Sequence, residues 1–311
     1  MRILFVTSNR LGDAVLSTGL LDHLIRTHPD ARITVVCGPV AAGIFTRMPQ
    51  REQTIVLEKR PYGRHWLPLW ASVAGIWWDL VVDIRGSALS FLVPTRRRAI
   101  MRRRPGHKTA QLAAILALDP PPLPVAWTSK ADRLRAAALL PGGRPVIALA
   151  PTANWGPKIW PPENFAEVFR RLARQTLPGA VPAVFAGPGD TERSLAAPVL
   201  AALPEAIDCV GNLSLPEAAA VLERAALFIG NDSGLMHLSA AAGAPTVGLF
   251  GPTDATEYAP AGRHTLALAG PSQDMAAISV TDVCEAAGYL LNQTSKNPLG
   301  AYEILRTAPS E

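Results

Sequence analysis

The first residues that could do chemistry lie in the stretch IGNDSGLMHLSAAAGAPTVGLFGPTD, residues 229–254. An apolar strand pattern ends at Asn231, and a polar turn then opens a helix pattern that carries His237 on its first or second turn. Free backbone N–H groups at a helix N-terminus attract anions and commonly bind phosphate. We therefore expect a diphosphate to bind the side chains or N–H groups of Asp232, Ser233, Gly234 and Leu235.

Metal chemistry is not indicated by the sequence. A lone histidine such as His237 is more often a packed structural residue than a ligand, and no second histidine or carboxylate stands at metal-ligand spacing from it. Cys37, Cys209 and Cys284 lie far apart, which favours neither a disulfide framework nor a zinc site. Three such cysteines suit a reducing cytosol.

A second candidate phosphate site is the stretch APTANWGPKIWPPENFAEVF, residues 150–169. Thr152 and Asn154 follow a strand pattern, and Lys158 precedes a helix start. A hydroxyl, free N–H groups and one lysine can form a phosphate cradle. The alternative is an exposed loop with a solvated lysine.

Two further sites place carboxylates after strand patterns. Asp13 follows Gly12 at a helix start, where it could cap the helix or take a proton from an attacking hydroxyl. In FAGPGDTERSL, Asp190 and Glu192 could bind ribose hydroxyls or simply complement the helix dipole. The glycine spacing is not GxGxxG, which disfavours a nicotinamide dehydrogenase.

Positive charge is concentrated in one run. The chain has a net charge of +5, and residues 96–108 carry seven Lys and Arg and no acid. Such a run is by default a solvated loop, and the functional alternative is an anion-binding face. Nucleic acid is disfavoured because the run lacks interleaved aromatic residues. The candidate acceptor and anion face comprises Arg85, Arg96, Arg97, Arg98, Arg102, Arg103 and Arg104.

The elements that must position these residues alternate between apolar strand runs and helix patterns. Near-continuous apolar strands between helices predict parallel sheets covered on both faces. The alternation restarts after a Pro-rich stretch, so we expect an α/β protein of two doubly wound domains, 1–142 and 143–291, with a cleft between them and a polar tail over 292–311. Expected helices span residues 13–27, 40–48, 109–118, 130–140, 162–175, 191–203, 216–225, 235–242 and 280–291.

Together these segments resemble a known family. NRLGDAVLSTGLLDHLIRTHPDARITVV, WDLVVDIRGSALS, KIWPPENFAEV and residues 229–254 look like the bacterial heptosyltransferases of lipopolysaccharide core synthesis, glycosyltransferase family 9. The resemblance covers most of residues 1–291 and implies a GT-B fold of two Rossmann-like domains. It implies inverting, metal-independent transfer of heptose from ADP-heptose, bound by the C-terminal half, to a lipid A-linked core acceptor, bound by the N-terminal half.

The resemblance also implies a role for each candidate residue. Asp13 matches the proposed general base, and Lys158 the phosphate-contacting lysine, with Thr152 or Asn154 as further phosphate contacts. The turn at the diphosphate corresponds to Asp232, Ser233 and Gly234, with His237 in the same motif. The acid that contacts the nucleoside corresponds to Asp190 or Glu192. No cofactor is expected beyond the ADP-sugar substrate.

Other functions stay open at this point. One is a GT-B-like transferase or epimerase that uses another sugar nucleotide, and another is a catalytically silent nucleotide-binding relative. An apolar segment over residues 66–93 is interrupted by Asp79, Asp83 and Arg85, and its unbroken part is shorter than a bilayer span. We expect a cytoplasmic protein, with peripheral contact to the inner membrane as an open alternative.

Overall fold

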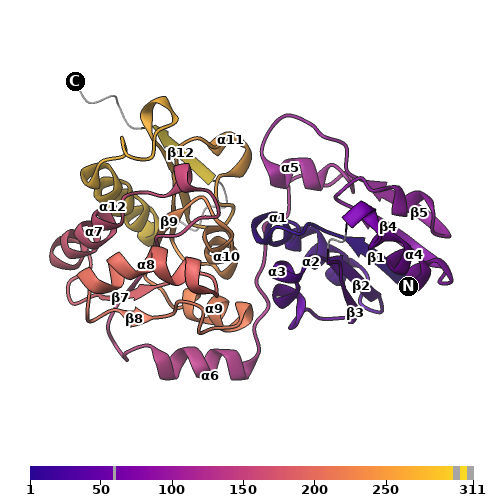
Figure 1. The fold of residues 1–311 in the computed structure, drawn as a ribbon, viewed down its shortest axis with the longest axis horizontal. Coiled ribbons are helices and arrows are strands. Elements are labelled where there is room, and N and C mark those ends of the chain that lie inside the picture. The colour runs from indigo at the N-terminus through magenta and orange to yellow at the C-terminus, as the bar shows by residue number, and fades with distance from the viewer. Residues whose placement is uncertain (59–60, 297–301, 307–311) are drawn as a thin grey trace. The chain divides into compact units, whose positions relative to one another are not determined.

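The chain forms two compact units, Met1–Trp127 and Thr128–Glu311 (Figure 1). The computed structural model describes residues 1–58, 61–296 and 302–306. We predicted the junction after residue 142, whereas the helix over Lys130–Leu139 belongs to the second unit.

The first unit is built on a parallel sheet. Its five strands in the described part of the chain lie in the order β3-β2-β1-β4-β5. One face of the sheet packs against Leu69 and Val73 of α4 (Trp66–Ala74). Ile3 and Phe5 of β1 lie on the other face and are fully buried. The strands are β1 (Arg2–Val6), β2 (Arg32–Cys37), β3 (Arg51–Val56), β4 (Trp78–Asp83) and β5 (Thr95–Ile100). The helices are α1 (Leu11–Leu16), α2 (Thr18–Thr27), α3 (Pro39–Ala42), α4 (Trp66–Ala74) and α5 (Lys108–Ala113), with 3-10 turns η1 (Gly43–Phe45), η2 (Pro61–Gly63) and η3 (Ala88–Phe91).

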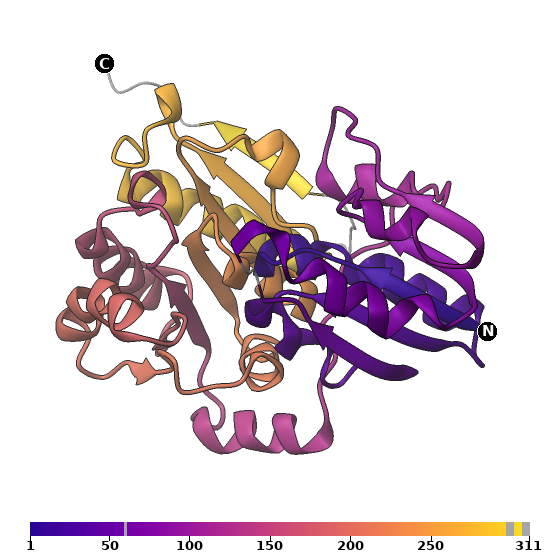
Figure 2. The ribbon, with the colours of Figure 1, turned by 45° about the vertical axis from the view of Figure 1, so that its right-hand side comes forward.

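The second unit is also built on a parallel sheet. Its seven described strands lie in the order β12-β11-β10-β9-β6-β7-β8, and Figure 2 shows β9 to β12 side by side in orange and yellow. The strands are β6 (Val146–Ala150), β7 (Val181–Val184), β8 (Ile207–Asp208), β9 (Leu227–Asn231), β10 (Thr246–Phe250), β11 (Thr265–Ala269) and β12 (Tyr302–Arg306). The helices are α6 (Lys130–Leu139), α7 (Pro162–Gln175), α8 (Asp190–Ala202), α9 (Leu215–Leu222), α10 (Gly234–Ala242), α11 (Ala255–Tyr258) and α12 (Val280–Lys296), with 3-10 turns η4 (Gly156–Lys158) and η5 (Pro271–Gln273).

Helices cover both faces of the second sheet. Alternate strand residues such as Ile229 and Leu249 share a core with α7, α8 and α12. The intervening positions face α10, because a Cβ added to Gly248 would meet the Met236 sulfur at 2.3 Å. Ser239, fully buried on α10, also hydrogen-bonds Thr246 of β10. Small residues therefore let α10 approach the sheet, as the sequence indicated, and the doubly wound architecture is confirmed.

Several elements differ from the sequence-based prediction. The single helix expected over 13–27 is split at Ser17, whose hydroxyl donates to the Ala14 carbonyl at 2.7 Å. The arginine run, interpreted by default as a loop, contributes strand β5 at the sheet edge, which corrects that interpretation for residues 95–100. Strand β11 was missed. Residues 292–296 extend α12 and Tyr302–Arg306 pair with β11, where a polar tail was expected; the rest of that tail lies outside the described residues.

Two helical glycines give a matched test of the packing. A Cβ at Gly19 on α2 would lie 2.6 Å from the Pro122 carbonyl oxygen, whereas one at Gly288 on α12 meets nothing within 4 Å. Gly19→Ala should therefore destabilise by about 1–3 kcal/mol through overpacking. Gly288→Ala should stabilise by about 0.5–1 kcal/mol through its helix propensity. Thermal denaturation followed by circular dichroism measures both, and a raised midpoint for Gly19→Ala would contradict this packing.

Candidate functional site

The candidate donor site lies at the carboxyl edge of the second sheet. Strands β10, β9, β6 and β7 are neighbours, so the loops that follow them emerge side by side. The predicted phosphate- and nucleoside-binding residues all lie on these loops or at the starts of the helices that follow. The sheet topology alone thus gathers segments that are up to 80 residues apart, as the Asn231–Pro151 hydrogen bond illustrates.

Asn231 holds the loop after β6, although it was not among the predicted site residues. Its side chain is fully buried, its Oδ1 accepts from the Trp160 N–H at 3.2 Å, and its Nδ2 donates to the Pro151 carbonyl at 2.9 Å. The two bonds fasten both ends of the 152–159 segment. The signal that could have revealed it is an amide side chain at the last position of an apolar strand, where a partner is obligatory.

Lys158 and Asp232 form the central charged contact. The Lys158 Nζ donates to Asp232 Oδ2 at 2.6 Å, and the two side chains are 18% and 8% exposed. His237 Nε2 lies 4.0 Å from the other carboxylate oxygen. An ammonium has three donors, so Lys158 can bind a phosphate oxygen while it keeps Asp232.

The N-terminus of α10 completes this group. Ser233 is the N-cap but makes no side-chain capping bond, and the His237 N–H is the first to bond back into the helix, to the Ser233 carbonyl. The N–H groups of Gly234 and Leu235 thus have no intrahelical acceptor. Within the described residues, the buried hydroxyls of Ser233 and Thr253 have no hydrogen-bond partner. Buried orphan hydroxyls beside free N–H groups fit a phosphate ligand.

The Glu192 carboxylate, predicted to contact the nucleoside, is already hydrogen-bonded within the protein. Its Oε2 accepts from the Thr152 hydroxyl at 2.6 Å and from the Gly187 N–H at 3.1 Å. It thereby ties the loops after β6 and β7, and the Thr152 proton is directed at a carboxylate. Asp190 and Asn154 are exposed, and the side chain of neither hydrogen-bonds to Lys158, Asp232, His237, Thr152 or Glu192. The structure therefore brings together five of the predicted residues in two groups: Lys158, Asp232 and His237, and Thr152 with Glu192.

Asp13 lies at the corresponding edge of the first sheet. It is the third residue of α1, half-buried, and its Oδ2 accepts from the Ser8 hydroxyl at 3.2 Å. The helix begins two residues earlier than expected, with Arg10 as the N-cap, so the alternative of Asp13 as N-cap is wrong. Its other carboxylate oxygen accepts no hydrogen bond from a described residue, which suits a proton acceptor.

Arg85 differs from the other predicted arginines. Its Nη1 donates to Asn9 Oδ1 at 3.3 Å, in the loop that leads to Asp13, and its guanidinium stacks 5.3 Å from the Trp66 ring centroid. The fully buried Asp83, missed as a site residue, orders this segment by accepting from the Arg85 N–H and from the Ser87 N–H and hydroxyl. The other candidates are exposed: Arg96, Arg97 and Arg98 on β5, and Arg102, Arg103 and Arg104 after it.

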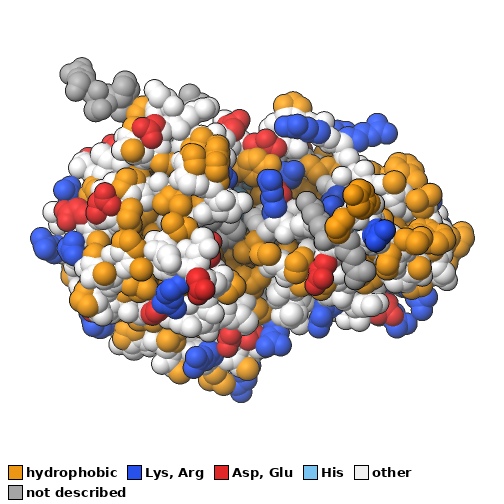
Figure 3. All heavy atoms as spheres, in the orientation of Figure 1, with side chains coloured by type: hydrophobic (Ala, Val, Ile, Leu, Met, Phe, Trp, Pro, Cys, Tyr) orange, Lys and Arg blue, Asp and Glu red, His pale blue; other side chains and the backbone are white. Residues whose placement is uncertain are grey.

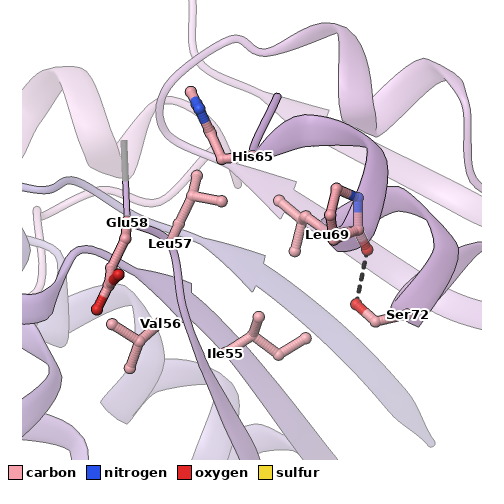
Figure 4. A pocket seen from close by; sticks show the side chains of 8 residues that line it. Ile55, Val56, Leu57, Glu58, His65, Leu69 and Ser72 are labelled. Carbon is pink, nitrogen blue, oxygen red and sulfur yellow. Dashed lines mark hydrogen bonds between the residues drawn. The ribbon is translucent and has the colours of Figure 1, made fainter. Parts of the chain in front are cut away.

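The first unit also contains a pocket of about 320 Å³ between the end of β3 and α4 (Figure 4). Its walls are mostly apolar, with Glu58 and His65 as ionisable groups, and the Ser72 hydroxyl is occupied by the Leu69 carbonyl at 2.6 Å. The predicted site residues are not among those that line it. We assign it no ligand.

The two buried cysteines, and the carboxylate and histidine side chains of the described residues, bear on whether the protein could form thiolate or metal sites. Burial raises the pKa of both Cys37 and Cys209 to about 12, so neither thiol supplies a thiolate nucleophile near neutral pH. Across residues 1–58, 61–296 and 302–306, no group of three or more His, Cys, Asp or Glu side chains is placed to hold a metal ion.

Known proteins are similar to this chain in sequence and in fold. The sequence model of glycosyltransferase family 9 (heptosyltransferase) matches residues 78–287. Lipooligosaccharide heptosyltransferase 2 of Haemophilus influenzae is 26% identical over 306 residues, which cover 84% of this chain and 86% of the relative.

Two solved structures show the same fold. A family 9 glycosyl transferase from Veillonella parvula has a TM-score of 0.81 at 22% identity, over 94% of this chain and 97% of its own. The E. coli ADP-heptose lipopolysaccharide heptosyltransferase II has a TM-score of 0.74 at 21% identity, over 95% and 100%. The two Rossmann-like units are therefore those of a GT-B fold. Since the family model spans more than half of the chain, the protein is an enzyme of glycosyltransferase family 9, the heptosyltransferases.

Proposed function

We propose that this enzyme transfers a heptose from ADP-heptose to a lipid A-linked lipopolysaccharide core acceptor, with inversion and without a metal ion. The observation that carries the proposal is the second unit's anion site, where Lys158 meets Asp232 beside the free N-terminus of α10. The E. coli structural relative is named for ADP-heptose, and the Haemophilus relative for lipooligosaccharide, which supports the donor and the acceptor class.

The chemistry requires one base and a stabilised leaving group. Asp13 accepts the proton of the acceptor hydroxyl as its oxygen forms a bond to the anomeric carbon of the heptose. The bond from that carbon to the β-phosphate oxygen breaks, and its electrons leave with ADP. A single displacement inverts the anomeric centre. The Ser8 hydroxyl, 3.2 Å from Asp13 Oδ2, holds the carboxylate in place.

The leaving diphosphate is held by protein groups in this proposal. The Lys158 ammonium, the Gly234 and Leu235 N–H groups and the Ser233 hydroxyl supply positive charge and donors, which is the role that a metal plays in other transferases. His237, within 4.0 Å of Asp232, positions that carboxylate. Asn154 and the backbone of Thr152, on the loop that carries Lys158, are assigned to a second phosphate contact.

Nucleoside and acceptor contacts complete the proposal. Asp190 is exposed at the start of α8 and is assigned to the ribose, while Glu192 positions Thr152 rather than meeting the nucleoside directly. Arg85, beside the Asp13 loop, and the exposed arginines of residues 96–104 are assigned to phosphates of the acceptor. The enzyme would work in the cytoplasm, where it meets its lipid-linked acceptor at the inner membrane.

Replacement of the base tests the mechanism. Asp13→Asn should lower the rate of heptose transfer by about 10²–10⁴-fold, because the amide cannot accept the proton. ADP affinity should not change, since the donor site is on the other unit. Asp22→Asn, a carboxylate on α2 that pairs with Arg26, is the matched control. Near-wild-type transfer by Asp13→Asn would show that another group is the base.

Removal of the lysine tests the phosphate site. Lys158→Gln should weaken ADP binding by about 10–100-fold, because a charge-assisted hydrogen bond is lost, and transfer should fall with it. The exposed Lys130→Gln on the same unit should leave both unchanged. Titration calorimetry measures the affinity, with the melting temperature as a check because Asp232 loses its partner. An unchanged ADP affinity in folded Lys158→Gln would remove Lys158 from the donor site.

A further inference from the structure

Helix α4 has an outward face of unusual composition. Residues 66–78 contain no charged side chain. Leu69 and Val73 on one side of the helix are buried in the core of the first unit, but Leu67 on another side is 69% exposed and Trp70 is 40% exposed. A helix that is apolar all round is normally buried, so an exposed one indicates an interaction surface.

The exposed side of α4 continues onto its neighbours. The Trp70 Nε1 donates to the Leu92 carbonyl at 2.9 Å, which joins α4 to the end of η3, where Phe91 and Leu92 are 66% and 62% exposed. The Trp78 N–H donates to the Pro94 carbonyl, which places Trp77, 64% exposed, beside the same segment. We call Leu67, Trp70, Trp77, Phe91 and Leu92 the apolar face; Figure 3 shows hydrophobic side chains gathered at this end of the first unit.

Positive charge borders the apolar face. The Arg98 side chain donates to the carbonyls of Ser90 and Val93, at 2.7 and 3.0 Å, which fixes its guanidinium against η3. Arg96 shares a strand face with Arg98 because side chains alternate along β5, and both are exposed. No acid lies within residues 84–118. The register of β4 and β5 places Asp79 beside Arg96, and this half-buried carboxylate already accepts from the Arg2 N–H at 2.7 Å.

We infer that the apolar face docks the first unit onto an anionic lipid bilayer. Indole rings prefer the boundary between headgroups and acyl chains, and leucine and phenylalanine add apolar contact there. The arginines that border the apolar face would contact lipid phosphates in the headgroup region, just outside the inserted rings. No described helix is long and apolar enough to cross a membrane. The inference rests on the proposed function only in that a lipid-linked acceptor lies in a membrane.

The test is flotation of the full chain with vesicles, without donor or acceptor. The wild type should float with phosphatidylethanolamine–phosphatidylglycerol vesicles, and less in high salt or with phosphatidylcholine alone. Leu67→Ser with Phe91→Ser should reduce the bound fraction about tenfold by removing two inserting side chains. Leu134→Ser on α6, where the leucine is 61% exposed, is the matched control and should float as the wild type does.

A second variant tests the inference independently in case the first variant does not fold. Trp77→Ser removes another exposed ring of the apolar face and should also lower the bound fraction, while its melting temperature shows whether the fold is intact. The inference is overturned if the wild type remains in the bottom fraction in the presence of anionic vesicles. It is also overturned if a folded Leu67→Ser, Phe91→Ser variant floats as the wild type does. A concentration-dependent dimer that these substitutions abolish, without vesicle binding, assigns the face to a second copy instead. ADP calorimetry on the same samples reports separately on the proposed function.

Discussion

The candidate donor site depends on one buried amide. Asn231 bonds the Pro151 carbonyl and the Trp160 N–H, and these two bonds bracket the segment that contains Thr152 and Lys158. The next residue along the chain, Asp232, receives the Lys158 ammonium. One strand end therefore fixes both the loop and its charged partner. If the loop moved, the buried Asn231 amide would lose these partners at a high cost in free energy. The loop is therefore expected to keep this conformation.

In both units, a buried polar side chain at a strand end orders the loops at the carboxyl edge of the sheet. In each, parallel strands deliver loops to that edge. Asp83 does this in the first unit, where Arg85 then reaches Asn9 in the Asp13 loop. In the proposed function, the first unit supplies a carboxylate that accepts a proton, and the second unit supplies an anion site. These are the two functions that a sugar transfer from a nucleotide donor needs.

Much of this could be predicted from local patterns. Helix α7 was predicted to the residue because Pro162 and an apolar period of 3.6 mark it. The candidate phosphate turn at Asp232 was proposed because a strand pattern ends there in polar and small residues. Contacts between distant segments could not be predicted. An amide at the end of an apolar strand indicates that Asn231 needs a partner but does not identify Pro151, and the Thr152–Glu192 bond has no local signal. Strand β5 was missed because its three consecutive arginines obscure the strand pattern. An exposed edge strand tolerates such charged residues. Helix α4 was missed because its sequence, apolar except for Ser72, lacks the usual polar face.

The central claim is that the protein alone, without a metal, forms an ADP-selective diphosphate site around Lys158 and the α10 N-terminus. The most direct test is titration calorimetry of ADP, UDP, GDP and NAD against the wild-type chain, with magnesium and with a chelator. We expect ADP to bind selectively and with the same affinity in both conditions. A preference for UDP or GDP, an ADP affinity that requires magnesium, or no binding of any nucleotide would contradict the claim.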